Sequence, residues 1–221
     1  MLIDPREIEI ISQARQKNIR DHTRSREHFN NIFKDFFCWI DFKSMSVIDL
    51  GPGQYDFGLL AMERGAMQVA AIDNDPAVLE LGRYRNYTVV DARLQDLKLD
   101  WFKEPFDLVF CKFSINCFWF WDDEAQLRDH IDYVASLVKA GGYSWIAPWN
   151  GVPKSIELSS VQVDKVLSIQ REAFLKNGFE VIELTDKQAV RYGVTGAVAN
   201  HALFTKNLSI SVHIASRTCT I

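Results

Sequence analysis

Cysteine is scarce in this chain, and no two cysteines form a Cys-x-x-Cys pair. Cys38, Cys111, Cys117 and Cys219 are spread over 221 residues. This spacing is unlike that of a structural zinc site, and disulfide frameworks are typical of short, cysteine-dense secreted chains. We therefore expect reduced thiols, no metal ion and a cytoplasmic protein.

The sequence also lacks long apolar runs and an excess of positive charge. No apolar stretch approaches the roughly 18 residues of a membrane-spanning helix, and the first residues do not resemble a secretory signal. The net charge of −4 disfavours a broad nucleic-acid-binding surface. Apolar residues make up 48% of the chain, which is typical of a globular domain. We expect a small-molecule substrate as partner, but neither DNA nor a membrane, and the sequence leaves a homodimer open.

One stretch near residue 50 organises the rest of the chain. The segment Val47–Leu50, three apolar residues and one acid, leads directly into the glycine-rich segment Gly51–Gln54. This predicts a buried strand that ends in a loop where backbone approaches a ligand, because glycine has no Cβ. A second apolar run, Met67–Ile72, ends in Asp73. An acid at the tip of the second strand, roughly 20 residues after the glycines, is where nucleotide-binding α/β folds accept ribose hydroxyls.

Two cofactor classes suit this pattern, nicotinamide dinucleotides and S-adenosylmethionine. The dinucleotide fingerprint is Gly-x-Gly-x-x-Gly, and its sixth place is Asp56 in this sequence. A carboxylate at that place would repel a pyrophosphate. S-adenosylmethionine carries a sulfonium and no phosphate, so it tolerates acids in the loop.

At these residues the sequence resembles the class I (Rossmann-like) S-adenosylmethionine-dependent methyltransferases. Val47–Gln54 looks like their glycine-rich first motif, and Ala71–Asp73 looks like their ribose-binding acid. The resemblance covers residues 44–206 and includes three further segments, the adenine-binding Val89–Ala92, the fourth strand Phe106–Phe110 and the turn Leu137–Gly142. Tyr55 departs from the pattern, because the family commonly has a third glycine there.

The resemblance implies S-adenosylmethionine as cofactor and S-adenosylhomocysteine as product. It places the cofactor-binding residues at the carboxyl ends of four strands: Asp49, Gly51, Pro52, Gly53, Gln54, Asp73, Asn74, Asp91, Ala92, Cys111 and Lys112. Asp73 would accept the ribose hydroxyls and Asp91 the adenine amino group, with Asp96 as a rival for the second role.

The acceptor site is expected in two aromatic-rich loops that follow the fourth and fifth strands. Its expected binding residues are Phe113, Asn116, Trp149 and Asn150. The catalytic residues are unknown at this stage. His28 and His201 are candidates for a general base, but a lone histidine is more often structural, and neither is assigned.

Alternating strands and helices predict a three-layer Rossmann-like α/β sandwich. We expect one seven-stranded, mostly parallel sheet with strands at 46–51, 67–73, 86–90, 106–112, 142–148, 179–184 and 199–206. Helices are expected at 55–64, 75–84, 123–139 and 159–176. No helical pattern separates the last two strands, so the seventh strand should return antiparallel as a hairpin.

The expected organisation has three parts: an N-terminal helical extension (1–42), a methyltransferase domain (43–207) and a tail that could add a strand (208–221). Aromatic residues at helical spacing in the extension indicate either packing against the domain or a lid over the cofactor cleft. The expected function is O- or N-methylation of a small molecule. The alternatives are a protein or RNA methyltransferase, and a non-catalytic S-adenosylmethionine-binding domain.

Overall fold

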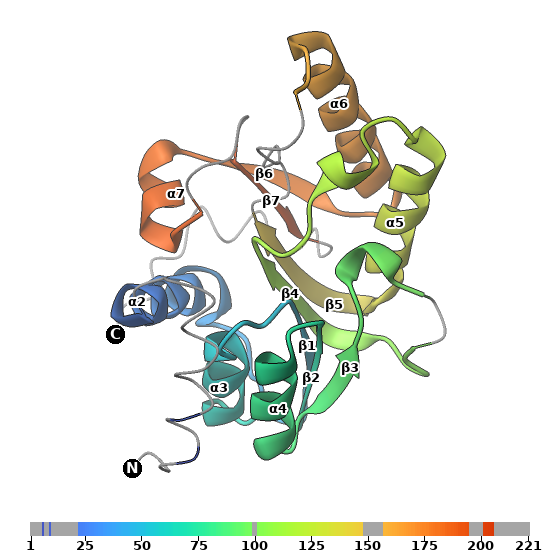
Figure 1. The fold of residues 1–221 in the computed structure, drawn as a ribbon. Coiled ribbons are helices and arrows are strands. Elements are labelled where there is room, and N and C mark those ends of the chain that lie inside the picture. The colour runs from blue at the N-terminus through green and yellow to red at the C-terminus, as the bar shows by residue number, and fades with distance from the viewer. Residues whose placement is uncertain are drawn as a thin grey trace.

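A computed structural model describes residues 6, 9, 22–98, 101–147, 157–194 and 201–205. Five parallel strands form a sheet in the order β3-β2-β1-β4-β5 (Figure 1). They are β1 (Ser46–Leu50), β2 (Gln68–Asp73), β3 (Thr88–Asp91), β4 (Phe106–Lys112) and β5 (Val138–Ala147). The expected parallel α/β fold is therefore confirmed for the first five strands.

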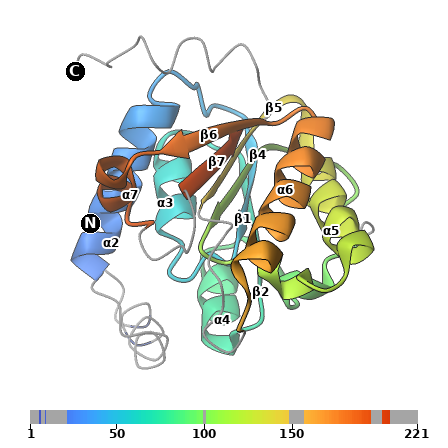
Figure 2. The same cartoon turned by 90° about the horizontal axis from the view of Figure 1, so that it is seen from above.

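Helices cover both faces of this sheet (Figure 2). One side holds α2 (His22–Ile32), the π-helical turn η1 (Phe33–Phe37), α3 (Asp56–Glu63) and α7 (Asp186–Tyr192). The other side holds α5 (Glu124–Ser136) and α6 (Ser160–Lys176), with the short 3-10 turn η3 (Cys117–Phe120). The remaining helices are α4 (Pro76–Tyr84), whose Val78 and Leu81 pack on the first side, and the 3-10 turn η2 (Leu94–Asp96).

A stack of three aromatic rings joins α3 to the sheet. The rings of Phe57 and Phe110 lie 3.9 Å apart at 7°, and those of Phe110 and Trp145 lie 4.9 Å apart at 9°. All three side chains are buried. Offset-stacked rings contribute beyond their buried area, so this column fixes the position of α3 over β4 and β5.

The aromatic stripe of the N-terminal extension packs into the same core. Phe33 is 1% exposed, and its ring lies within 5.5 Å of the rings of Phe37, Phe42 and Phe57. These aromatic side chains therefore pack against the domain, as one of the two interpretations expected. A closing role of the extension stays a prediction, and most of residues 1–21 lie outside the described part of the structure.

A polar cluster links η1 to α7, which are far apart in the sequence. Arg191 donates to both carboxylate oxygens of Asp35, at 2.6 and 3.0 Å, and the Tyr192 hydroxyl donates to Asp35 at 3.0 Å. The Asn31 amide also donates to the Arg191 carbonyl at 3.2 Å. Bidentate arginine–carboxylate pairs are directional, so they hold the two segments in one orientation.

The expected seven-stranded sheet is wrong. β6 (Glu180–Leu184) and β7 (His201–Thr205) pair antiparallel with each other in a separate two-stranded sheet. The hairpin return is thus as expected. β7 lies beside β5 but does not hydrogen-bond into the main sheet. Apolar patterning shows that a strand exists, whereas the edge that it pairs with depends on backbone spacing set by the whole fold.

The expectation of no helix between these two strands is also wrong, because α7 lies there. Thr185 and Gln188 form a capping box, in which each side chain bonds the other's backbone N–H, at 3.3 and 3.0 Å. Gly193 ends the helix with a φ of 61°. The Thr-x-x-Gln pattern was the sequence signal for this helix start.

The boundary between α5 and β5 differs from the expected one. The helix ends at Ser136 and the strand already begins at Val138, so Gly141 and Gly142 lie within β5. The ladder with β4 shifts register between Phe106 and Leu108. Glycines thus mark an irregularity in the strand here, rather than the turn before it.

The cysteines partly follow the expectation. Cys111 and Cys117 are buried and free, but Cys38 is disulfide-bonded, so the expectation of reduced thiols is wrong for Cys38. Sequence spacing reports only on local cysteine pairs and cannot exclude a bond between distant ones. Within the described ranges, no cluster of three or more His, Cys, Asp or Glu could hold a metal ion. No helix among the described residues is long and apolar enough to cross a membrane.

Candidate functional site

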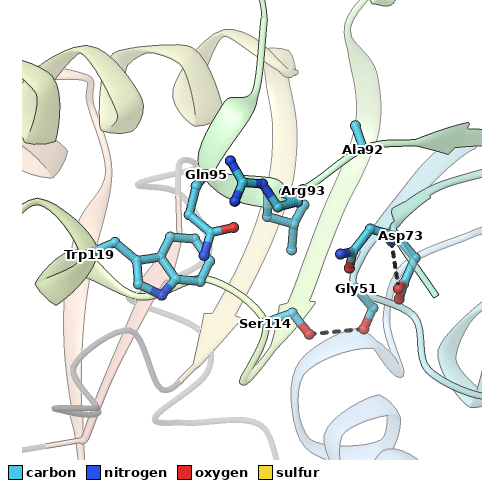
Figure 3. Close-up of a pocket in the computed structure, with 9 residues that line it drawn as sticks. Gly51, Asp73, Ala92, Arg93, Gln95, Ser114 and Trp119 are labelled. Carbon is cyan, nitrogen blue, oxygen red and sulfur yellow. Dashed lines mark hydrogen bonds between the residues drawn. The ribbon is translucent and has the colours of Figure 1, made fainter. Parts of the chain in front are cut away.

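A cavity of about 320 Å³ opens at the carboxyl ends of the parallel strands (Figure 3). Four segments contribute to it: the loop after β1, the tip of β2, the turn after β3 and the segment after β4. The lining residues are Gly51, Asp73, Asn74, Ala92, Arg93, Leu94, Gln95, Ser114 and Trp119. Ligands of open α/β sheets bind at this edge, where the strand order reverses between β1 and β4.

Gly51 is required where the loops after β1 and β4 meet. It has a φ of +73°, and a Cβ on it would overlap the Cβ and Oγ of Ser114. The Ser114 hydroxyl donates to the Gly51 carbonyl at 3.0 Å, and the Gly51 N–H donates to Ile72 at 2.9 Å. By contrast, nothing lies within 4 Å of a Cβ on Gly53. The loop is therefore tight at Gly51 and open at Gly53, where a ligand can approach its backbone.

The Asp73 carboxylate is oriented by its own turn. One oxygen accepts the backbone N–H groups of Asn74 and Asp75, at 2.8 and 2.9 Å. Asp75 caps α4 by accepting the Ala77 N–H at 2.9 Å. Burial raises the pKa of Asp73, and the N–H groups of Asp75, Asn74 and Gly53 partly offset this rise. A half-buried, preoriented carboxyl at this tip suits a ligand that donates hydroxyl hydrogen bonds.

Asp49 is a buried acid beneath the glycine loop. It is 3% exposed, and among the described residues its carboxyl accepts no hydrogen bond. Burial raises its pKa well above the ordinary value, and the nearby carboxylates of Asp73 and Asp56 raise it further. An unpaired buried carboxylate is costly, so a cationic ligand that restores its ionised form would be favoured there.

Asp49→Asn should therefore stabilise the ligand-free protein while it weakens cofactor binding. A raised folded pKa favours the protonated acid, so its stabilising effect is present at low pH and lost as pH rises through the folded pKa. At pH 7 we expect Asn to raise the Tm by about 2–4 °C, equivalent to roughly 1 kcal/mol for this size. This gain should vanish below about pH 4.

Melting curves between pH 4 and 8, with titration calorimetry of S-adenosylhomocysteine at pH 7, measure both effects. Asp91→Asn is a matched control, because Asp91 is exposed and its Tm should not change. A lower Tm for Asp49→Asn at pH 7 would instead assign the carboxyl a structural role.

The turn after β3 differs from the expected adenine site. Asp91 lies opposite Asp73 in the ladder, but it is exposed and does not line the cavity. Its rival Asp96 is held by Arg93, whose Nε and Nη2 donate at 2.8 and 3.1 Å. Gln95 faces the cavity instead, and Trp119 stands on its side of the opening (Figure 3).

Of the expected binding residues, Gly51, Asp73, Asn74 and Ala92 line the cavity. Five further residues line it that were not among the expected binding residues: Arg93, Leu94, Gln95, Ser114 and Trp119. The aromatic run after β4 was noted as an acceptor loop, but nothing in its pattern places Trp119 beside the turn after β3.

The expected site residues at and just after the end of β4 do not line the cavity. Cys111 is 1% exposed, and burial raises the pKa of its thiol to about 12. The Lys112 ammonium lies 5.0 Å from the ring centre of Phe29 in α2 and 5.9 Å from that of Phe113. The Asn116 side chain caps η3 by accepting the Phe118 N–H at 2.9 Å.

The other expected site residues are placed as follows. Pro52 and Gln54 lie in the glycine loop without lining the cavity. His28 packs on Gly193, since a Cβ on that glycine would overlap its imidazole ring. Trp149, Asn150 and the His201 side chain lie outside the described part of the structure.

Comparisons with known proteins place this fold. No protein-family model matches the chain, and a search of curated proteins found no relative. The sugar N-methyltransferase KedS8 from Streptoalloteichus is similar with a TM-score of 0.55 and 14% identity, over 87% of this chain and 90% of that one. The N-methyltransferase NodS from Bradyrhizobium japonicum gives 0.52 and 14%, over 84% and 96%.

A third structure, an S-adenosylmethionine-dependent methyltransferase from Mesorhizobium loti, has a TM-score of 0.51 and 18% identity. It covers 75% of this chain and 91% of its own. At these identities the likeness concerns the fold alone. The strand order, the glycine loop and these neighbours show that the chain has the class I, Rossmann-like fold of S-adenosylmethionine-dependent methyltransferases.

Proposed function

We propose that the protein transfers a methyl group from S-adenosylmethionine to an oxygen or nitrogen of a small-molecule acceptor. One observation carries the proposal: Gly51 of the glycine loop and the oriented Asp73 line one cavity of about 320 Å³ at the edge of the sheet, and the buried acid Asp49 lies near the end of β1, just before the loop. A cationic nucleoside complements that combination of an open backbone and two acids.

The residues present fit this cofactor. Asp73 would accept the ribose hydroxyls, and Asp49 would lie near the ammonium of the methionine part. Leu94 and Trp119 offer apolar surfaces for the adenine ring, and the Gln95 amide can both donate to and accept from its edge. When bound, the cofactor supplies a methyl group activated by its sulfonium.

The chain itself contributes alignment and the exclusion of water. Methyl transfer is an in-line displacement, so holding the two reactants at the correct angle and distance is the main requirement. The acceptor would lie at the end of β4, near the rings of Phe29 and Phe113. We include in the proposal that the N-terminal extension covers this end of the site. A hydroxyl acceptor would also need a base within hydrogen-bonding distance.

Two observations support a small acceptor over a macromolecule. The net charge is −4, which disfavours binding to RNA. One protein of similar fold is the sugar N-methyltransferase KedS8. Protein or RNA methylation and a non-catalytic binding domain are therefore outcomes that the experiment must separate.

Titration calorimetry with S-adenosylhomocysteine and with NADH tests the cofactor, and only the first should bind. Tighter binding of NADH would overturn the proposal. Methyl-labelled S-adenosylmethionine is then incubated with the protein and a cell extract that has been separated into small molecules, RNA and protein. Label in the small-molecule fraction is expected. Label in RNA or protein would favour those acceptors, and binding without any labelled product would indicate a non-catalytic domain.

A further inference from the structure

The feature that departs from the family pattern, Tyr55, has an unusual backbone conformation. Tyr55 has a φ of 61° and a ψ of 28°, the left-handed region where glycine is normal and a tyrosine is strained. Its N–H donates to the Pro52 carbonyl at 2.9 Å and closes the glycine loop. Its own carbonyl accepts the Leu59 N–H at 2.9 Å and begins α3. Such strain persists only where the surroundings over-determine the conformation.

The side chain of Tyr55 supplies that constraint. It is 0% exposed, is not among the residues that line the cavity, and lies against Gly82 of α4. A Cβ on Gly82 would overlap the Tyr55 hydroxyl oxygen, and it would lie 2.8 Å from the Tyr55 Cζ and 2.5 Å from a methyl of Val89. The ring of Tyr87 lies 5.3 Å from that of Tyr55. Gly82 therefore leaves the space that the phenol occupies.

α4 holds the same loop at a second point. Arg85, at the end of α4, donates from Nη1 to the Gln54 carbonyl at 3.1 Å. The other end of α4 is capped by Asp75, which immediately follows the turn that orients Asp73. One helix thus contacts both the glycine loop and the turn that carries the ribose-type acid.

We propose that Tyr55 is a positioning residue whose phenol, inserted against Gly82, sets the separation between the Gly51–Gln54 loop and Asp73. The inference rests on the proposed function, because S-adenosylmethionine would bind across that separation with its methionine end at the loop and its ribose at Asp73. Tyr55 touches neither end. Where a third glycine would leave the loop flexible, Tyr55 holds it in one conformation.

The phenol acts through its ring and its volume. Its hydroxyl is buried and has no hydrogen-bond partner among the described residues. An unsatisfied buried hydroxyl costs stability, so Tyr55→Phe should keep the geometry and the affinity for cofactor. Tyr55→Gly removes the insertion without adding strain, and Gly82→Ala forces the phenol out by steric overlap.

The test measures binding of whole S-adenosylhomocysteine and of adenosine alone, by calorimetry, together with the Tm of each variant. Adenosine reaches only the Asp73 end. We expect Tyr55→Gly and Gly82→Ala to lower the affinity for S-adenosylhomocysteine by about 10-fold or more, with adenosine affinity within about two-fold of wild type. Tyr55→Phe should match wild type for both ligands. Gly58→Ala, whose Cβ would lie 3.2 Å from Val69, is a control for mild overpacking in α3, the helix that Tyr55 begins.

The double variant Tyr55→Gly/Gly82→Ala should lose no more affinity than Tyr55→Gly alone, because the added Cβ at position 82 then has no phenol to overlap. Losses that simply add would overturn the inference. Equal losses for both ligands that parallel the Tm would overturn the inference and leave Tyr55 a structural residue. Wild-type affinity in folded Tyr55→Gly would also overturn it. If wild-type protein binds no S-adenosylhomocysteine at all, the proposed function fails first and this inference fails with it.

Discussion

Asp73→Ala is expected to weaken binding of S-adenosylhomocysteine by roughly 10- to 1000-fold. Two ribose hydroxyls that donate to one carboxylate form charged hydrogen bonds, each contributing about 1.5–3 kcal/mol. Each 1.4 kcal/mol or so corresponds to a factor of ten in affinity. Titration calorimetry at neutral pH measures the change.

Two further variants distinguish the loss of contacts to the ligand from the loss of the hydrogen bonds that Asp73 makes within its own turn. Asp73→Asn keeps an oxygen for the N–H groups of Asn74 and Asp75, so its Tm should exceed that of Asp73→Ala, although it lacks the charge. Asp75→Ala removes the α4 cap at a cost of about 1 kcal/mol of stability, with little change in affinity. If Asp75→Ala alone weakens binding, Asp75 is the ribose acceptor and the assignment of Asp73 is wrong.

Gly51→Ala should lower both stability and cofactor affinity by a large amount. A residue with a Cβ loses about 1–2 kcal/mol of stability when it adopts the left-handed φ of this position. Overlap with Ser114 adds about 1–3 kcal/mol, unless the loop after β4 moves away. Movement of that loop would also displace Ser114 from the cavity that it lines. We expect an affinity loss of roughly 30-fold or more, measured with S-adenosylhomocysteine.

A matched control isolates the contact from the backbone strain. Gly141 has nearly the same φ, +75°, but a Cβ there meets nothing within 4 Å. Gly141→Ala should therefore cost only the strain and leave cofactor affinity unchanged. Adding Ser114→Gly to Gly51→Ala should restore part of the loss. If Gly51→Ala and Gly141→Ala lower the stability and the cofactor affinity equally, Ser114 moves aside at little cost and does not hold the loop after β1.

Local signals in the sequence predict the position of a residue where one short segment determines it. Gly51 and Asp73 each follow directly from a strand and the turn after it, so spacing placed both correctly at one edge. Gln95 follows β3 and Trp119 follows β4, and these two strands flank β2 and β1 in the sheet. The two residues line the same cavity because of this strand order, which no local sequence pattern specifies.

The difference between local and long-range determinants also explains the errors in the predicted fold. The hairpin of β6 and β7 could be predicted from neighbouring segments, whereas their separation from the main sheet is decided by how distant backbones fit. The left-handed backbone of Tyr55 was not predictable either, because its side chain fits into space left by Gly82 in another helix. A glycine inside a helical pattern indicates a close contact, but it does not say which residue makes it.

The link between η1 and α7 has a consequence for how the chain folds during synthesis. Asp35 and Arg191 are separated by 156 residues, so their pairing is a contact of very high sequence separation. At the usual rate of translation, roughly 8–30 s pass between the emergence of these two residues. Phe33 can meet Phe42 and Phe57 early, but Phe36 packs against Trp145 and Tyr192, which emerge late. The nascent chain therefore exposes an aromatic surface until α7 is made, and this interval is when a chaperone would have the most to bind.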